Sequence, residues 1–267
     1  MPSIVTKNIR CAAGMPAVVA IPAGSGKFPA IVLMHERYGL VQHSLDLAQR
    51  FAREGFVCIT PDFFFRFPDQ DGLHRGDVGY PLGDTEAIEL LNIAIDELAK
   101  MPEVDASKIA VKGVCQTGRH PVLIAAERPI AAALVWYGAA SEREWKVSER
   151  FTKPFDDIVA RIACPVLGIF GEGDHVVSLD DVRRFRDLLD RHDKSYTIKV
   201  YRDVPHGWLN DTMPGRYRRD AAEAAWALQR NFLKQVLDPA YDKTRVVQVY
   251  ESDHARNYDF TKNARME

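Results

Sequence analysis

The apolar positions along the chain fall into two kinds of segment that alternate. Short, almost continuous apolar runs bounded by turn residues are typical of strands buried on both faces of a sheet. Segments whose apolar residues recur with the period of a helix lie between them. The runs cover residues 17–21, 30–34, 56–60, 109–111, 131–137, 166–170 and 197–201, and the helical segments cover 43–53, 84–100, 179–191 and 219–236.

This alternation predicts an α/β fold with a mainly parallel sheet and helices on both of its faces. Asp84 or Thr85 is expected to cap the second helical segment. No repeat or Pro/Gly-rich linker divides the chain, so residues 1–237 are expected to form one domain. Residues 66–83 are rich in Gly, Pro and Asp and predict a long loop, whereas residues 238–267 predict a packed arm or a tail.

Composition narrows the class of protein without naming a function. The 267 residues are 46% hydrophobic, and the net charge of −2 suggests neither nucleic acid nor an anionic membrane as a partner. Residues 1–10 lack the apolar core of a signal peptide, and no apolar run is long enough to cross a bilayer. The cysteines, without a CxxC pair, favour a reducing, cytoplasmic location and no metal site; they are Cys11, Cys58, Cys115 and Cys164.

The first candidate for chemistry is Cys115, within Ile-Ala-Val-Lys-Gly-Val-Cys-Gln-Thr-Gly at residues 109–118. A strand, a sharp turn and a helix are expected here, as in a nucleophile elbow, and Gly113 prevents a clash beside the turn. The N-terminus of the following helix would stabilise a thiolate. The alternative is a buried structural cysteine, because free cysteines are commonly buried.

Two further residues complete a triad in the order nucleophile, acid, histidine. Asp174 and His206 each follow a predicted strand, so both are expected at the carboxyl edge of the sheet. His206 would accept the thiol proton, and Asp174 would hold the imidazole in the correct tautomer. Glu172 and His175 are local rivals, although their positions are more typical of solvated loop residues.

Over about residues 25–237 the chain resembles the dienelactone hydrolase family. The turn around Cys115 is similar to the family's Gly-x-Cys-x-Gly-Gly elbow. Residues 32–39, Val-Leu-Met-His-Glu-Arg-Tyr-Gly, resemble its glutamate-bearing loop, and Pro61-Asp62 resembles the end of its next strand. The resemblance implies an α/β-hydrolase fold and a cytoplasmic, cysteine-dependent hydrolase of a lactone or small ester, of the kind used in aromatic compound degradation.

The resemblance also implies roles for individual residues. Glu36 would interact with the thiol in the resting enzyme and couple its activation to substrate binding. The backbone N–H groups of Arg37 and Gln116 would form the oxyanion hole. The acyl-enzyme would be a thioester, and neither a metal nor an organic cofactor would be needed.

The sequence departs from the family pattern in the elbow and around the histidine. Thr117 replaces a glycine, and Pro121 would lie too deep in a helix that begins near Gln116, so a kinked or late-starting helix is expected. The family binds its substrate's carboxylate with arginines, one of them just after the histidine, where this chain has no arginine until Arg216. The other candidate arginines are Arg37, Arg66, Arg75 and Arg119, and the substrate-binding candidates chosen from the sequence are Arg75, Arg119 and Trp208. Phe63, Phe64, Phe65 and Phe67 are more typical of packing than of contact with an aromatic substrate.

Three functions stay open at this point. The leading hypothesis is thiol-dependent hydrolysis of a small-molecule lactone or ester, by a protein that could be a homodimer. The same scaffold could instead hydrolyse a C–C bond or transfer an acyl group. A non-catalytic binding protein is the third hypothesis; Thr117 and Pro121 favour it, and the complete Cys–His–Asp set opposes it.

Overall fold

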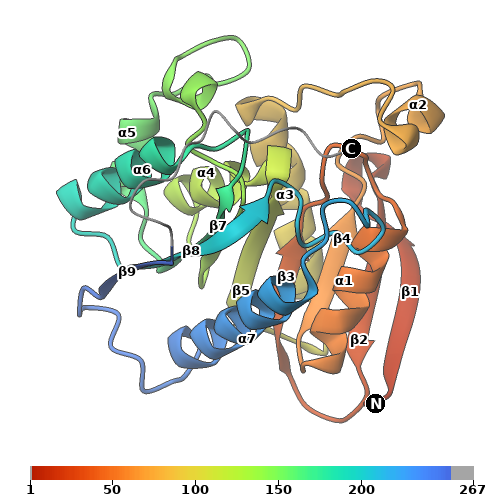
Figure 1. The fold of residues 1–267 in the computed structure, drawn as a ribbon. Coiled ribbons are helices and arrows are strands. Elements are labelled where there is room, and N and C mark those ends of the chain that lie inside the picture. The colour runs from red at the N-terminus through yellow and green to blue at the C-terminus, as the bar shows by residue number, and fades with distance from the viewer. Residues whose placement is uncertain (1, 254–267) are drawn as a thin grey trace.

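The computed structural model describes residues 2–253. Within them lies one sheet of nine strands in the order β1-β2-β4-β3-β5-β6-β7-β8-β9 (Figure 1). β2 pairs antiparallel with β1 and β4, and every other neighbouring pair is parallel. The strands are β1 (Ile4–Arg10), β2 (Pro16–Pro22), β3 (Phe28–Leu33), β4 (Val57–Pro61), β5 (Val104–Val114), β6 (Ala133–Trp136), β7 (Val166–Gly173), β8 (Tyr196–Pro205) and β9 (Gln248–Ser252).

Helices cover both faces of this sheet, as the sequence pattern predicts (Figure 1). α1 (Gln42–Arg53) and α7 (Arg219–Val236) pack on one face. The other face carries α3 (Asp84–Lys100), α4 (His120–Glu127), α5 (Phe155–Arg161) and α6 (Leu179–Arg191). The protein therefore has the α/β architecture expected from its sequence. No helix in residues 2–253 is long and apolar enough to cross a membrane.

The two core layers explain why the strand runs are continuous rather than alternating. On β3, Ile31 and Leu33 pack toward α1 and α7, whereas Ala30 and Val32 pack toward α3. Successive side chains of a strand point to opposite faces, so a strand covered on both faces needs apolar residues at every position. Phe63 and Phe64, which follow β4, are both buried in the α3 layer as packing residues.

Some expectations about the chain between strands were wrong. The expected loop at 66–83 contains a short helix, α2 (Gln70–Arg75). Gly83, not Asp84 or Thr85, occupies the N-cap position of α3, and the carboxylate of Asp84, its first residue, binds Arg119. β1 was missed because most of its side chains are exposed, so no apolar run marks it.

The chain after α7 returns to the sheet. β9 pairs in parallel with β8, and the backbone N–H of Tyr196 donates to Val247 O at 2.8 Å. Val249 and Tyr250 are half-buried, and Tyr250 packs against the core layer of α6. This part of the expected arm therefore packs on the body, while residues 254–267, with Tyr258 and Phe260, lie outside the described residues.

Candidate active site

Five neighbouring strands bring polar groups together at the carboxyl edge of the sheet. Glu36 follows β3, Cys115 follows β5, Tyr137 follows β6, Asp174 follows β7 and His206 lies just after β8. Four of them line a cavity of about 650 Å³: Glu36, Cys115, Tyr137 and His206. Ligands of open parallel sheets bind at this edge, so the cavity is the candidate active site.

The backbone at Cys115 has the strained geometry of a nucleophile elbow. Its φ is +57°, a left-handed conformation that non-glycine residues rarely adopt. A Cβ at Gly113 would lie 2.2 Å from Thr117 O, so the turn needs glycine there. A 3₁₀ turn spans Cys115–Thr117, and α4 begins only at His120. Pro121 thus falls in the first turn of α4, where proline costs little, and the expected late-starting helix is confirmed.

Thr117 has a bonding role where the family pattern has glycine. Its Oγ1 accepts a hydrogen bond from the Val114 N–H at 3.0 Å. The same oxygen lies 2.9 Å from Val114 O and 3.0 Å from His35 O, the two carbonyls to which it can donate. The hydroxyl therefore joins the elbow to the loop after β3, and its side chain fits without displacing the turn.

Cys115, His206 and Asp174 form a continuous chain of hydrogen bonds. His206 Nε2 lies 3.0 Å from Cys115 Sγ, and His206 Nδ1 lies 2.8 Å from Asp174 Oδ2. The second carboxylate oxygen of Asp174 accepts from the N–H groups of Val176 and Val177 at 2.7 and 3.0 Å. Asp174 is thereby fixed from both sides, and it orients the imidazole toward the thiol.

Electrostatics favour the charged form of this histidine. Burial disfavours an imidazolium at His206, but the negative charges of Asp174 and then Cys115 outweigh burial and raise its pKa well above the ordinary value. Burial raises the pKa of the Cys11 thiol to about 11 and that of the Cys164 thiol to about 12. Among the described cysteines, only Cys115 has a histidine within hydrogen-bond distance.

Glu36 is held by two residues that sequence reasoning missed. Tyr137 donates its hydroxyl to Glu36 Oε1 at 3.1 Å, and Asn210 Nδ2 donates to Oε2 at 2.9 Å. His35 Nε2 accepts from the Phe63 N–H, so its Nδ1 carries the proton and donates to Glu36 O. Asn210 lies only four residues after His206, and this proximity could have marked it as a site residue. Tyr137 ends the apolar run at 131–137, so nothing in the sequence distinguished it from a core residue.

The two residues expected to form the oxyanion hole, Arg37 and Gln116, both line the cavity beside Cys115. Their side chains bond away from it: Gln116 Nε2 donates to Tyr80 O, and Arg37 Nη2 donates to Gly76 O at 3.1 Å. These contacts leave the backbone groups as the natural contribution of both residues to the site.

Arg75, Arg119 and Trp208 do not line the candidate active site, whereas Arg37, another candidate arginine, does. Arg119 and Trp208 are fully buried away from the cavity, Arg119 paired with Asp84 and Trp208 stacked on Trp136. Arg75 is exposed, pairs with Asp77, and lines a second cavity of about 940 Å³ next to the first. The arginines that do line the candidate active site are Arg37, Arg143 and Arg216.

The two rivals of the triad have different surroundings. Glu172, expected to be solvated, is buried and accepts from the Asp203 N–H at 3.0 Å, so it joins β7 to β8. His175 lines the cavity with its ring centroid 5.8 Å from that of His206. In residues 2–253, no group of three or more His, Cys, Asp or Glu side chains is arranged to hold a metal ion.

Comparison with known proteins identifies the family of this chain. The model of the dienelactone hydrolase family matches residues 15–237. A Salmonella typhimurium protein assigned as a carboxymethylenebutenolidase is 30% identical over 79% of this chain and 79% of its own. A Bradyrhizobium protein assigned as a 2-oxo-3-(5-oxofuran-2-ylidene)propanoate lactonase is 25% identical over 79% of this chain and 85% of its own.

A solved structure gives the same result for the fold. The crystal structure of a protein assigned as a dienelactone hydrolase from Klebsiella pneumoniae superposes with a TM-score of 0.78 and 26% identity, covering 87% of this chain and 99% of the other. The elbow and strands β2 to β8 lie within the residues that the family model matches. The chain therefore belongs to the dienelactone hydrolase family and is a hydrolase of the α/β-hydrolase fold.

Proposed function

We propose that the protein is a cysteine-dependent hydrolase of lactones or small esters that works through a thioester acyl-enzyme. The observation that carries the proposal is the unbroken hydrogen-bond chain from Cys115 through His206 to Asp174, with its thiol end at a cavity. A binding protein has no need of this chain. Thr117 and Pro121, the residues that favoured a binding protein, both fit the elbow without disturbing it.

The proposed reaction has two steps. The Cys115 thiolate attacks the substrate carbonyl carbon, the ring or ester C–O bond breaks, and His206 gives its proton to the departing oxygen. Water then attacks the thioester while His206 takes a proton from it, and the C–S bond breaks to release the acid and restore the Cys115 thiolate beside protonated His206. Asp174 holds the imidazole in place through both steps.

The oxyanion of each tetrahedral intermediate would be bound by the backbone N–H groups of Arg37 and Gln116. Donors fixed before the reaction contribute about 3–4 kcal/mol each to lowering such a barrier. The Glu36 carboxylate, held at the cavity by Tyr137 and Asn210, would respond to a substrate that enters beside it. Its proposed role is to couple thiol activation to substrate binding.

The cavity offers positive charge to an acid group on a substrate. Arg143 and Arg216 line it together with Arg37, whose side chain bonds to Gly76 O, and the carboxylates of Glu36, Glu142 and Glu144 line it as well. The name of the Bradyrhizobium relative describes an oxofuran ring, a lactone, that carries a propanoate. A lactone bearing a carboxylate is therefore the substrate class that we propose.

A panel of γ-lactones, aryl esters and lactone carboxylic acids tests this function. Wild-type protein should hydrolyse at least one class, and Cys115→Ala should hydrolyse none, because its nucleophile is lost. Cys164→Ala is the matched control, since Cys164 is a buried cysteine outside the cavity. Hydrolysis by Cys115→Ala at the wild-type rate would exclude the thiol mechanism.

A further inference from the structure

One side of the cavity is built by a single stretch of chain after β6. We call residues 138–153 the wall segment; its cavity-lining members are Gly138, Ala139, Ser141, Glu142, Arg143 and Glu144. The backbone is strained where the segment begins, with φ of +35° at Tyr137, +59° at Ala139 and +63° at Ala140. Non-glycine residues keep this conformation only where their surroundings hold them, so contacts elsewhere must fix the wall segment.

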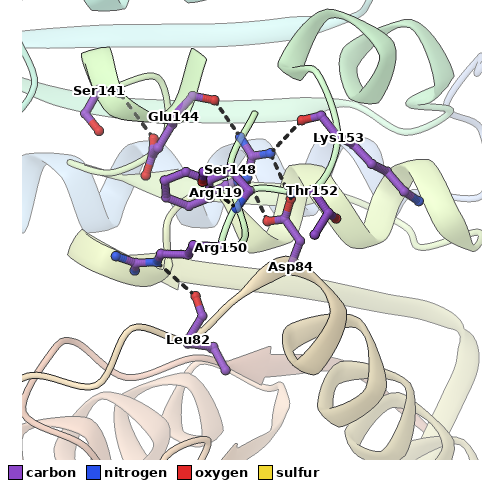
Figure 2. A network of polar contacts seen from close by, with 10 residues as sticks. Leu82, Asp84, Arg119, Ser141, Glu144, Ser148, Arg150, Thr152 and Lys153 are labelled. Atoms are coloured by element: carbon purple, nitrogen blue, oxygen red, sulfur yellow. Dashed lines mark hydrogen bonds and ion pairs between the residues drawn. The ribbon is translucent and has the colours of Figure 1, made fainter. Parts of the chain in front are cut away.

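Four of those contacts come from the two residues of one buried ion pair, formed between the start of α3 and the turn after the elbow (Figure 2). Arg119 Nη1 donates to Glu144 O at 3.0 Å, and Nη2 donates to Lys153 O at 3.2 Å. Asp84 Oδ2 accepts from the Thr152 N–H at 3.0 Å. The backbone N–H of Asp84 also donates to Arg150 O at 2.8 Å. Arg119 and Asp84 together therefore hydrogen-bond to four residues of the wall segment.

The ion pair itself is rigid. Arg119 Nε and Nη2 lie 2.9 and 3.0 Å from the two carboxylate oxygens of Asp84, and both side chains are fully buried. The guanidinium also lies over the rings of Phe151 and Phe155, at 4.8 and 5.1 Å from their centroids. A planar fork bound on both edges and covered on its face has little freedom to move.

The wall segment also touches the nucleophile turn directly. A Cβ at Gly138 would lie 2.2 Å from Cys115 O, and a Cβ at Gly118 would lie 2.5 Å from Gly138 Cα. Arg119 comes four residues after Cys115. The wall segment is therefore fixed at its start by contact with Cys115 and Gly118, and further along by hydrogen bonds to Arg119.

We infer that Arg119 and Asp84 are positioning residues, which set the distance between the wall segment and Cys115 and thereby the width of the substrate cavity. Neither side chain lines the cavity, so neither touches a substrate. The inference deepens the proposed function and rests on it for the claim that a substrate occupies this space. The geometry of the wall itself can be tested without any turnover.

The test compares two thiol reagents of different size on Cys115 at pH 8.5: iodoacetamide, which is small, and N-(1-pyrenyl)maleimide, which is bulky. Arg119→Lys keeps the charge but replaces the fork with a single ammonium, so it cannot reach all of its present partners. Its matched control is Arg128→Lys, because Arg128 at the end of α4 also binds α3, through Asn92 and Asp96, away from the cavity. Labelling in Cys115→Ala is subtracted as background.

Arg119→Lys should raise the ratio of bulky to small alkylation rates about fivefold or more, since a released wall segment admits the larger reagent. Arg128→Lys should leave the ratio unchanged. If an ester of the panel is turned over, its KM should rise about tenfold in Arg119→Lys with a smaller change in kcat. An unchanged ratio in Arg119→Lys, whatever happens to its melting temperature, would show that the pair only stabilises the fold.

A milder variant covers the case in which Arg119→Lys does not fold. Arg150 is half-buried in the wall segment, and its Nε donates to Leu82 O at 3.1 Å, next to the ion pair (Figure 2). Arg150→Ala removes this one attachment and leaves Arg119 and Asp84 intact. It should raise the reagent ratio about twofold to threefold, in line with one anchor lost among several; a ratio equal to that of wild type would overturn the inference.

Discussion

Two buried carboxylate–cation pairs meet the nucleophile elbow, and they differ in what their outer ends contact. Asp174 pairs with His206 and Asp84 pairs with Arg119, each at a shortest distance of 2.8 to 2.9 Å and with no side chain more than 6% exposed. The imidazole keeps its second nitrogen for Cys115 Sγ, whereas the guanidinium gives its remaining donors to backbone carbonyls. The first arrangement can move a proton, and the second can only hold the chain.

The largest expected effect lies in the catalytic pair. Cys115→Ala and His206→Ala should each lower kcat by about four orders of magnitude or more, because the two residues act as one unit. The double variant should be little worse than either single one, measured as kcat on the best substrate of the panel. If the loss of log kcat in the double variant equals the sum of the two single losses, the thiol and the imidazole act separately. The Asp174–His206 pair would then not be the proton-moving pair described above.

The structural pair should show its loss in stability instead. Arg119→Met leaves the Asp84 carboxylate buried and unpaired, so the free energy of unfolding should fall by about 3–5 kcal/mol. Asp84→Leu combined with Arg119→Met should recover part of that loss, since no lone charge stays buried. Urea unfolding measures both variants. A double variant that is less stable than Arg119→Met would contradict this account of the pair.

The pH dependence of stability separates the pairs again. The raised pKa of His206 means that the folded protein holds a proton that the unfolded chain releases above about pH 6.5. The resulting stabilisation is complete below that pH and is lost as pH rises through the higher folded pKa. Asp174→Asn should therefore lose most stability near pH 6 and progressively less toward pH 8.5, as measured by urea unfolding. A difference that is constant over this range would exclude the linkage.

Substitution of Glu36 is expected to have a smaller effect, and only on the reactivity of the Cys115 thiol. Its carboxylate accepts bonds from Tyr137 and Asn210 at the cavity, and Glu36→Gln keeps its size while removing its charge. We expect the variant to change the pH profile of Cys115 alkylation by iodoacetamide between pH 5 and 9. Glu142→Gln, which also lines the cavity, is the control. Superimposable profiles would remove Glu36 from the thiol-activating role.

The smallest expected effect comes from the segment after α7. We propose that residues 1–237 form the catalytic domain and that residues 238–267 form an accessory arm. Removing the arm exposes the edge of β8 and the core surface that Tyr250 covers, so the melting temperature should fall by about 2–6 °C. None of the arm's described residues, 238–253, lines the cavity, so KM should stay unchanged. A changed KM, or a change of oligomeric state in sedimentation, would give the arm a larger role.

Much of the fold could be predicted because burial on two faces leaves a clear pattern. The seven apolar runs all correspond to strands, and the predicted bounds of α3, α6 and α7 match the structure. β1 and β9 escaped prediction because edge strands are exposed and need no apolar run. α5, with only seven residues, is too short for its periodicity to stand out.

The residues of the candidate site could be predicted only where a local sequence pattern marks them. Cys115, Asp174 and His206 are each marked by a turn that follows a strand, so their proximity could be expected from order alone. The contacts of Arg119 depend on a carboxylate 35 residues earlier and on carbonyls 25 and 34 residues later. A charged side chain in a sequence gives no sign of whether its partner is solvent, a substrate or a buried aspartate. Arg119 was therefore misplaced at the substrate.

The close approach of Gly118 and Gly138 sets a limit on how this enzyme can be redesigned. A methyl group at Gly138 would lie 2.2 Å from the Cys115 carbonyl oxygen, so libraries that vary Gly138 would mostly return inactive clones, whatever the chosen substrate. Ser141, Glu142 and Arg143 face the same cavity without that restriction. Directed evolution toward new esters is best begun at these three positions, with the two glycines held constant.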